Sequence, residues 1–128
     1  MYVIRTHSGT IFLRAAGITA KTDNGDEQQV GFPKADIDGF IDTLMDGKPM
    51  AIVTKDTYLV LVPNVNRGTV YLHAEIGSIS ISDNVDFILK ASLGVGVDLI
   101  YESPANKKAT RVRYAPQPPA YYSVTIGP

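Results

Sequence analysis

Hydrophobic and polar residues alternate along the first quarter of the chain, and a turn signal follows each alternating run. The runs predict short strands over 2–6, 10–16, 18–22 and 28–32. Ser8-Gly9, Gly17 and the run Asp23-Asn24-Gly25-Asp26 separate them. Asn and Gly accept the positive φ that tight turns need at little cost. The pattern therefore predicts a four-stranded antiparallel meander.

A helical period replaces the alternation after Pro33. Five apolar residues fall at i, i+3, i+4, i+7 and i+8 and share one face of a helix: Ile37, Phe40, Ile41, Leu44 and Met45. Asp36 and Asp38 lie in the first turns, where the helix dipole favours acids, and Gly47 followed by Pro49 is a stop signal. The period predicts a first helix that ends at about residue 46.

A second helix is predicted after Ser82 or Asp83, which can cap it. Its buried face would consist of four apolar residues with similar spacing: Val85, Ile88, Leu89 and Leu93. Gly94 would be the residue that ends it.

Strands are predicted between and after the two helices, over 50–54, 58–62, 68–75, 78–82 and 95–102. The run 58–62 has no polar residue on either face, which predicts a central strand covered on both sides. In 78–82 the isoleucines are expected to face the core and the serines to face water. Residues 110–114 are expected to pair back on 95–102 as a hairpin.

Two phrases of similar sequence begin the two halves of the chain, Ser8-Gly-Thr-Ile-Phe-Leu13 and Arg67-Gly-Thr-Val-Tyr-Leu72. They suggest a ββββα unit that occurs twice, over 1–48 and 49–94; the alternative is that short β-turn-β phrases recur by chance. A doubled unit of this order resembles the purine-rich-element-binding and whirly-type folds, which implies binding of single-stranded nucleic acid.

The totals describe one ordinary globular domain. Of 128 residues 45% are hydrophobic and 20% are charged, and the formal net charge is −1. The predicted fold class is a β-rich α+β domain over 1–115, with antiparallel sheets, two short helices and a C-terminal hairpin; a Pro- and Tyr-rich arm follows over 116–128. The N-terminus lacks the pattern of a signal peptide, and no apolar run has the length of a membrane span. We therefore expect a soluble protein, located in a virion or in the cytoplasm.

Little in the chain resembles a catalytic or metal site. There is no cysteine, and His7 and His73 lack the spacing of a ligand pair. The acids of the first helix fall on its solvent side, and no Gly-x-Ser-x-Gly occurs. The sequence therefore predicts a protein that is not an enzyme and that holds no metal or cofactor.

Two classes of function remain. The first is a structural protein that forms symmetric homo-oligomers and contacts other structural proteins, such as a phage capsid decoration or tail component in a virion. Strand addition by the C-terminal arm would join the copies. The residues expected to carry it are Pro118, Pro119, Tyr121, Tyr122 and Val124.

The alternative is a module that binds single-stranded nucleic acid on a basic, aromatic sheet face. Cations would pair with phosphates and rings would stack on bases. The residues expected to do so are Arg14, Tyr71, Arg111, Arg113 and Tyr114. Strands also favour aromatic residues and use cations to protect their edges, and the near-neutral net charge favours that structural explanation.

Overall fold

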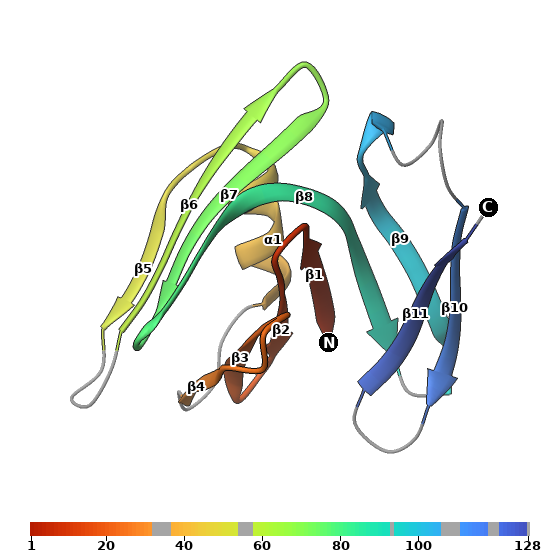
Figure 1. The fold of residues 1–128 in the computed structure, drawn as a ribbon, viewed down its shortest axis with the longest axis horizontal. Helices are drawn as coiled ribbons and strands as arrows, with labels where there is room; N and C mark the ends of the chain where they lie inside the picture. Colours follow the sequence, from red (N-terminus) through yellow and green to blue (C-terminus); the bar gives the residue numbers. More distant parts are fainter. Residues whose placement is uncertain (32–36, 54–57, 93, 106–110, 118–120, 128) are drawn as a thin grey trace.

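A computed structural model describes residues 1–31, 37–53, 58–92, 94–105, 111–117 and 121–127; for Ile52, 111–117 and 121–127 it describes the backbone alone. In this part of the chain one helix lies among eleven strands (Figure 1). The elements are β1 (Tyr2–Thr6), β2 (Gly9–Arg14), β3 (Gly17–Thr22), β4 (Glu27–Gly31), α1 (Ile37–Met45), β5 (Met50–Val53), β6 (Tyr58–Asn66), β7 (Thr69–Ile76), β8 (Ile79–Ser92), β9 (Gly96–Glu102), β10 (Arg111–Gln117) and β11 (Tyr121–Gly127).

Nine strands form one antiparallel sheet that curls around a core. Its order is β4-β3-β2-β1-β8-β7-β6-β5, and β9 also pairs with β8. Strand β8 bends through the middle of the molecule and belongs to both halves of the sheet (Figure 1). We call β1–β4 with the C-terminal half of β8 the first leaf, and β5–β7 with the N-terminal half of β8 the second leaf. The predicted meander over the first 31 residues is confirmed by β1–β4.

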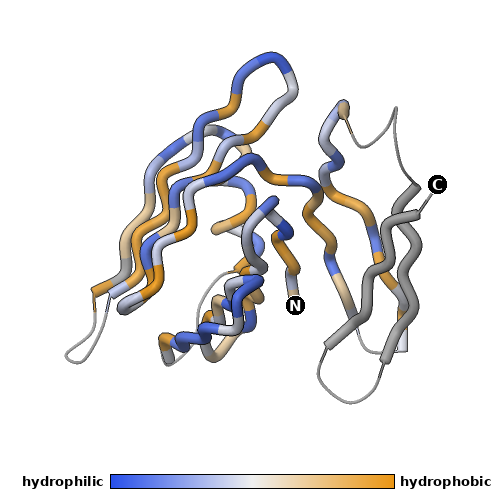
Figure 2. The backbone as a smooth tube through the Cα atoms, in the orientation of Figure 1, coloured by the Kyte–Doolittle hydropathy of each residue, from blue (hydrophilic) through white to orange (hydrophobic). Residues whose placement is uncertain are grey.

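The predicted second helix is wrong, because Val85 to Ser92 lies in β8. Consecutive residues from Val85 to Leu89 are all buried. Ile88 faces the main core between the leaves, whereas Phe87 and Leu89 face a second cluster on the other side of the first leaf, with Val3. A strand covered on both faces has the same density of apolar residues as a buried helix. Figure 2 shows this hydrophobic stretch in the descending part of β8.

The main core lies between the two leaves and is closed by α1. The first leaf contributes Ile4, Ile11 and Leu13, and the second leaf contributes Leu61 and Leu72, among others. The predicted first helix is confirmed, with Ile41 and Leu44 as its buried residues. The expectation for 78–82 is also confirmed, because Ile79 and Ile81 are buried while Ser80 and Ser82 are exposed.

A polar cluster joins α1 to the first leaf. Asp38 of the helix accepts a short hydrogen bond from the Tyr2 hydroxyl, and its Oδ1 lies 3.4 Å from Lys90 Nζ. The hydrogen bonds from Tyr2 and from Lys90 lower the pKa of Asp38, while burial and the contact with Asp38 raise the pKa of Tyr2. These contacts hold the start of α1 against β1 and β8.

The run 58–62 is not the central strand that its composition predicts. Leu59 and Leu61 are buried, but Tyr58 and Val62 alternate with them on the solvent side. The strand also continues through Pro63 to Asn66, in a stretch expected to be a loop. Pro63 is tolerated because its nitrogen points away from β7 and lies beyond Leu61, where the pairing of β6 with β5 ends, so no ladder hydrogen bond is lost.

The C-terminal pairing and the repeat also differ from expectation. β10 pairs with β11 in a separate two-stranded sheet and lies beside β9, which is itself hydrogen-bonded to β8 (Figure 1). Residues 121–127 thus return on 111–117 of the same chain. The ββββα repeat is not confirmed, because its second helix is strand. Gly9 lies inside β2, whereas Gly68 and Arg67 both have positive φ and form the tight turn before β7.

Within the described residues, the structure has no helix with the length and apolarity that a membrane crossing needs.

Candidate functional site

The residues predicted to bind nucleic acid are distributed over separate parts of the fold. Arg14 lies on β2 and alternates with the core residue Leu13, whereas Tyr71 lies on β7 and alternates with the core residue Leu72. Both side chains point away from the core between the leaves, so they lie on opposite outer faces of the molecule. Arg111, Arg113 and Tyr114 are in β10, of which the backbone is described.

The residues predicted for assembly lie in and next to β11. Pro118 and Pro119 are outside the described residues. Tyr121, Tyr122 and Val124 are in β11, in register with Gln117, Pro116 and Tyr114 of β10. The arm therefore adds a strand to its own chain through one edge of β11.

Two cations lie beside one aromatic ring on the outer side of the first leaf. The Arg14 guanidinium carbon is 5.5 Å and Lys21 Nζ is 5.8 Å from the centroid of the Phe12 ring. Arg14 Nη1 also donates to Thr19 Oγ1 at 3.3 Å. Cation–π contacts of this kind are worth about 0.5–1 kcal/mol at exposed sites. They give Phe12 a structural role in the first leaf.

The outer side of the second leaf carries several exposed apolar side chains. Strand alternation places the following side chains there, and we call this surface the outer face: Ala51, Val53, Tyr58, Val60, Val62, Tyr71, His73 and Glu75. Val53 is 80% exposed, and Tyr58, Val62 and Tyr71 are each 42% exposed. Glu75 is its one formal charge, and His73 Nε2 lies 3.4 Å from the Glu75 carboxylate.

The outer face ends at an open sheet edge. β5 is the last strand in the sheet order, and among the described strands it pairs with β6 alone. Its sequence, Met50-Ala-Ile-Val53, contains no charge and no proline. Natural proteins protect edge strands with Lys, Pro or bulges, and an apolar edge without them is a place where another strand adds.

A serine, a histidine and a carboxylate lie in a row on β7 and β8. His73 Nδ1 shares a short hydrogen bond with Ser82 Oγ, and its other nitrogen faces Glu75. Hydrolases use the same residue types, but they add a pocket and donors that stabilise an oxyanion. The described hollows are lined by other residues, and this row lies on an open sheet surface. We interpret it as a cross-strand polar contact.

A bulge in β8 contains the buried residue Asp86, which lies within the stretch predicted as the second helix. Arg5 pairs with Phe87 and Thr6 pairs with Val85, which leaves Asp86 as the extra residue. Its Oδ1 lies 3.0 Å from His7 Nδ1, and its carbonyl accepts a hydrogen bond from the Ser103 N–H at 2.8 Å. Burial raises the pKa of Asp86, and the nearby His7 and Arg5 partly offset that rise.

The Asp86 carboxyl should leave a signature in the pH dependence of stability. Because its folded pKa is raised, the folded state binds this proton more tightly than the unfolded state, where the pKa is about 3.9. Its contribution to stability is therefore largest below that value and is lost as pH rises through the folded pKa. In urea titrations from pH 3 to 7, wild type should lose free energy of unfolding relative to Asp86→Asn as pH rises. A difference that stays flat or slopes the other way would contradict the burial of this carboxyl.

Within the described residues, no group of three or more His, Asp or Glu side chains lies close enough to hold a metal ion. No protein-family model, curated protein or solved structure matches the chain significantly. The functional proposals below therefore rest on the geometry and charge of this molecule.

Proposed function

We propose that this protein is a non-enzymatic assembly component, which forms a symmetric homo-oligomer through the outer face and the β5 edge. The observation that carries the proposal is the apolar outer face beside an unprotected strand edge. Large exposed apolar patches on otherwise ordinary surfaces mark sites of protein association.

A second copy is the occupant that this surface fits best. Two β5 strands related by a twofold axis would run antiparallel, and an isologous contact of this kind uses the same residues on both sides. The near absence of charge on the outer face removes the repulsion that two identical charged surfaces would suffer. β5 has four residues, so the paired edge is short, and the outer-face side chains of β5, such as Val53, would add cross-strand contacts beside the twofold axis.

A particle built from many copies is the setting that we propose for such an oligomer, with a capsid decoration or tail protein of a phage as the specific form. The wealth of strands and tight turns supports this setting, and so does β11, which has a second strand edge that no described strand pairs. Its partners would then be copies of itself and other structural proteins.

The exposed valine on β5 gives the decisive test. Val53→Lys places a charge at the centre of the proposed contact, and the solution mass measured by light scattering should fall by a factor of two. Val95→Lys is the matched control, because Val95 is 85% exposed in the turn between β8 and β9, away from the outer face. Its mass should equal that of wild type.

A wild-type protein that stays monomeric at high concentration would overturn the proposal. In that case we would test the alternative function by titrating the protein with single-stranded nucleic acid at low and high salt. Equal masses for wild type and Val53→Lys oligomers would show that the copies associate elsewhere.

A further inference from the structure

The N-terminal half of β8 has an unpaired edge inside the body of the protein. On one side, Ile79 to Asn84 pair with β7. On the other side, β1 pairs with β8 only from Val85 onward. Among the described residues, no strand covers the edge of residues 79–83.

The backbone groups of Ser80 and Ser82 point out of this edge. Gly77 and Ser78 form a two-residue loop, so Ile76 and Ile79 are the hydrogen-bonded pair that closes the hairpin. Hydrogen-bonded and non-bonded pairs alternate along an antiparallel ladder, so Ser80, Ser82 and Asn84 direct their N–H and C=O groups away from β7. The Asn84 carbonyl confirms this direction, because it accepts the His7 N–H at 3.2 Å.

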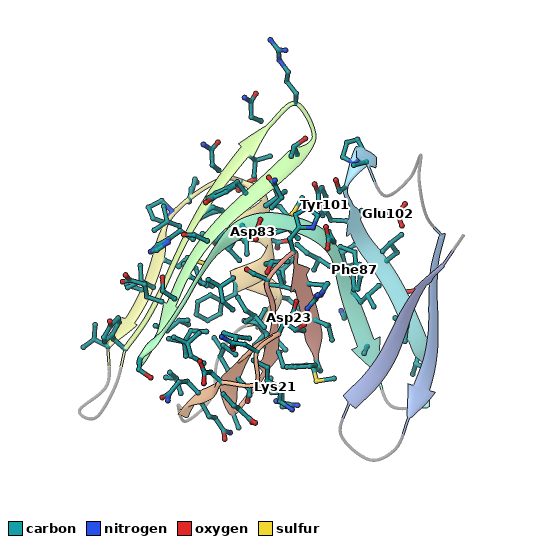
Figure 3. The ribbon with its side chains drawn as sticks, in the orientation of Figure 1. Lys21, Asp23, Asp83, Phe87, Tyr101 and Glu102 are labelled. Atoms are coloured by element: carbon teal, nitrogen blue, oxygen red, sulfur yellow. The ribbon has the colours of Figure 1, made fainter. Side chains whose placement is uncertain are left out.

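A polar groove runs along this edge. It consists of two adjoining hollows of about 430 and 340 Å³, which share Thr22, Asn24 and Ser80 in their walls. The wall opposite β8 is the turn between β3 and β4. Figure 3 labels Asp23 in this turn and Lys21 just before it.

The groove is acidic. Its described lining includes Asp23, Asp26 and Glu27 and no Lys or Arg. Arg5 holds the Asp23 carboxylate through two hydrogen bonds of 2.7 and 2.8 Å, and Lys21 lies opposite Glu27 in the ladder between β3 and β4. Asp26 has no ion pair among the described residues, and its backbone bonds are to Thr22.

The C-terminal segment carries the opposite charge and a free strand edge. Residues 103–128 contain four Lys or Arg and no Asp or Glu, whereas residues 1–102 contain the other eight Lys or Arg and all 13 acids. β11 is one of two strands in its sheet; one of its edges pairs with β10, and no strand of the described part of the chain pairs with the other. In Figure 1 this hairpin lies on the far side of β9 from the turns that form the groove, so it cannot fill the groove of its own chain.

We propose that the groove beside Ser80 receives β11 of a second copy as an added strand. The inference rests on the proposed function, that copies of the chain assemble, and names a second interface for that assembly. The contact is heterologous, since a hairpin on one copy meets a groove on the next. Repeated from copy to copy, this contact alone would give a closed ring or an open chain. The twofold contact at β5 would then join two rings, or two chains, to each other.

Two substitutions at Ser80 distinguish the contribution of its backbone N–H from that of its side chain. Ser80→Pro removes the N–H that points into the groove and leaves the ladder to β7 intact, whereas Ser80→Ala keeps that N–H. By sedimentation velocity, Ser80→Pro should be a dimer that persists through the β5 contact, and Ser80→Ala should have the wild-type mass. Equal thermal midpoints for the two variants establish that both fold; if Ser80→Pro unfolds, Asp26→Lys with Glu27→Lys replaces it.

Mixing tests whether the groove and the hairpin are partners. In the Val53→Lys background, Ser80→Pro lacks the groove edge, and Arg111→Glu with Arg113→Glu reverses the charge of the hairpin. Each protein alone should be monomeric, and an equimolar mixture should form a 1:1 pair whose association constant falls at least tenfold between 50 and 500 mM salt. Lys48→Glu with Arg67→Glu is the control for net charge and should associate like the Val53→Lys parent.

The outcomes distinguish this inference from the proposed function. If Val53→Lys halves the mass while Ser80→Pro leaves it unchanged, the proposed function stands and the inference is overturned. If the mixture stays monomeric, the groove and the hairpin are not partners and the inference is overturned as well. If wild type is monomeric, both are overturned.

Discussion

Ile88→Ala is expected to lower the free energy of unfolding by about 2–5 kcal/mol, because it removes three carbons from the centre of the core. Ile88 is fully buried, faces the main core and lies opposite both Ile4 of β1 and Tyr101 of β9. The cavity would therefore lie where the three strands meet. Urea denaturation followed by circular dichroism measures the loss.

The same substitution distinguishes the observed strand from the helix that the sequence predicts for this stretch. Alanine is the best helix former and a poor strand residue, so a helix over 83–93 would recover part of the loss through its backbone. Ile88→Val is the graded control and should cost about 0.5–1.5 kcal/mol. A loss below about 1 kcal/mol for Ile88→Ala would contradict a doubly covered strand at this position.

Gly9→Val is expected to destabilise the fold by about 1–3 kcal/mol through overpacking. A Cβ atom at Gly9 would lie 2.8 Å from Ile81 Cδ1 and 2.8 Å from the Lys21 carbonyl oxygen. The isoleucine can rotate, but the carbonyl belongs to the neighbouring strand and can move only with it. Because Ile81 belongs to β8, the substitution pushes the two leaves apart at this contact.

Gly31 offers a matched control for this second prediction. It also lies in a strand of the first leaf, and a Cβ atom there would meet nothing closer than the Ala16 carbonyl oxygen at 4.0 Å. Gly31→Val should therefore keep the wild-type midpoint in urea to within about 0.5 kcal/mol of unfolding free energy. If both variants lose the same free energy of unfolding, the loss comes from replacing any strand glycine and not from the contact of Gly9 with β8.

The meander and the first helix could be predicted from the sequence, whereas the second helix was predicted wrongly and the order of the strands in the sheet could not be predicted. The meander and α1 depend on alternation and on a helical period, which neighbouring residues determine. The error at 83–93 arose because Val85, Ile88 and Leu89 satisfy a helical stripe and a doubly covered strand equally well. Phe87 was the sign against a helix, since it falls outside that stripe and yet is buried.

The candidate surfaces depend on contacts between distant residues, which explains why the sequence did not show them. The outer face became visible only when the exposed side of β6 was known, because Tyr58 to Val62 is apolar throughout. Asp86 is buried only because β1 and β8 meet with a bulge. The acidic groove requires that the turn between β3 and β4 lie across from Ser80, about 55 residues further along the chain. The charge difference between the C-terminal segment and the rest was already present in the sequence.

The pairing of β1 with β8 sets the order in which this chain can complete its fold during synthesis. Tyr2 pairs with Lys90, so the partner of the first strand emerges about 90 residues later. At about 5–20 residues per second, this interval lasts about 4–18 s. During it, β1–β4 can form from local contacts, but Ile4 and Ile11 have no second leaf to cover them. Strand β1 is thus made long before its second partner, and the nascent meander has an open edge and an uncovered apolar face until residue 90 has left the ribosome.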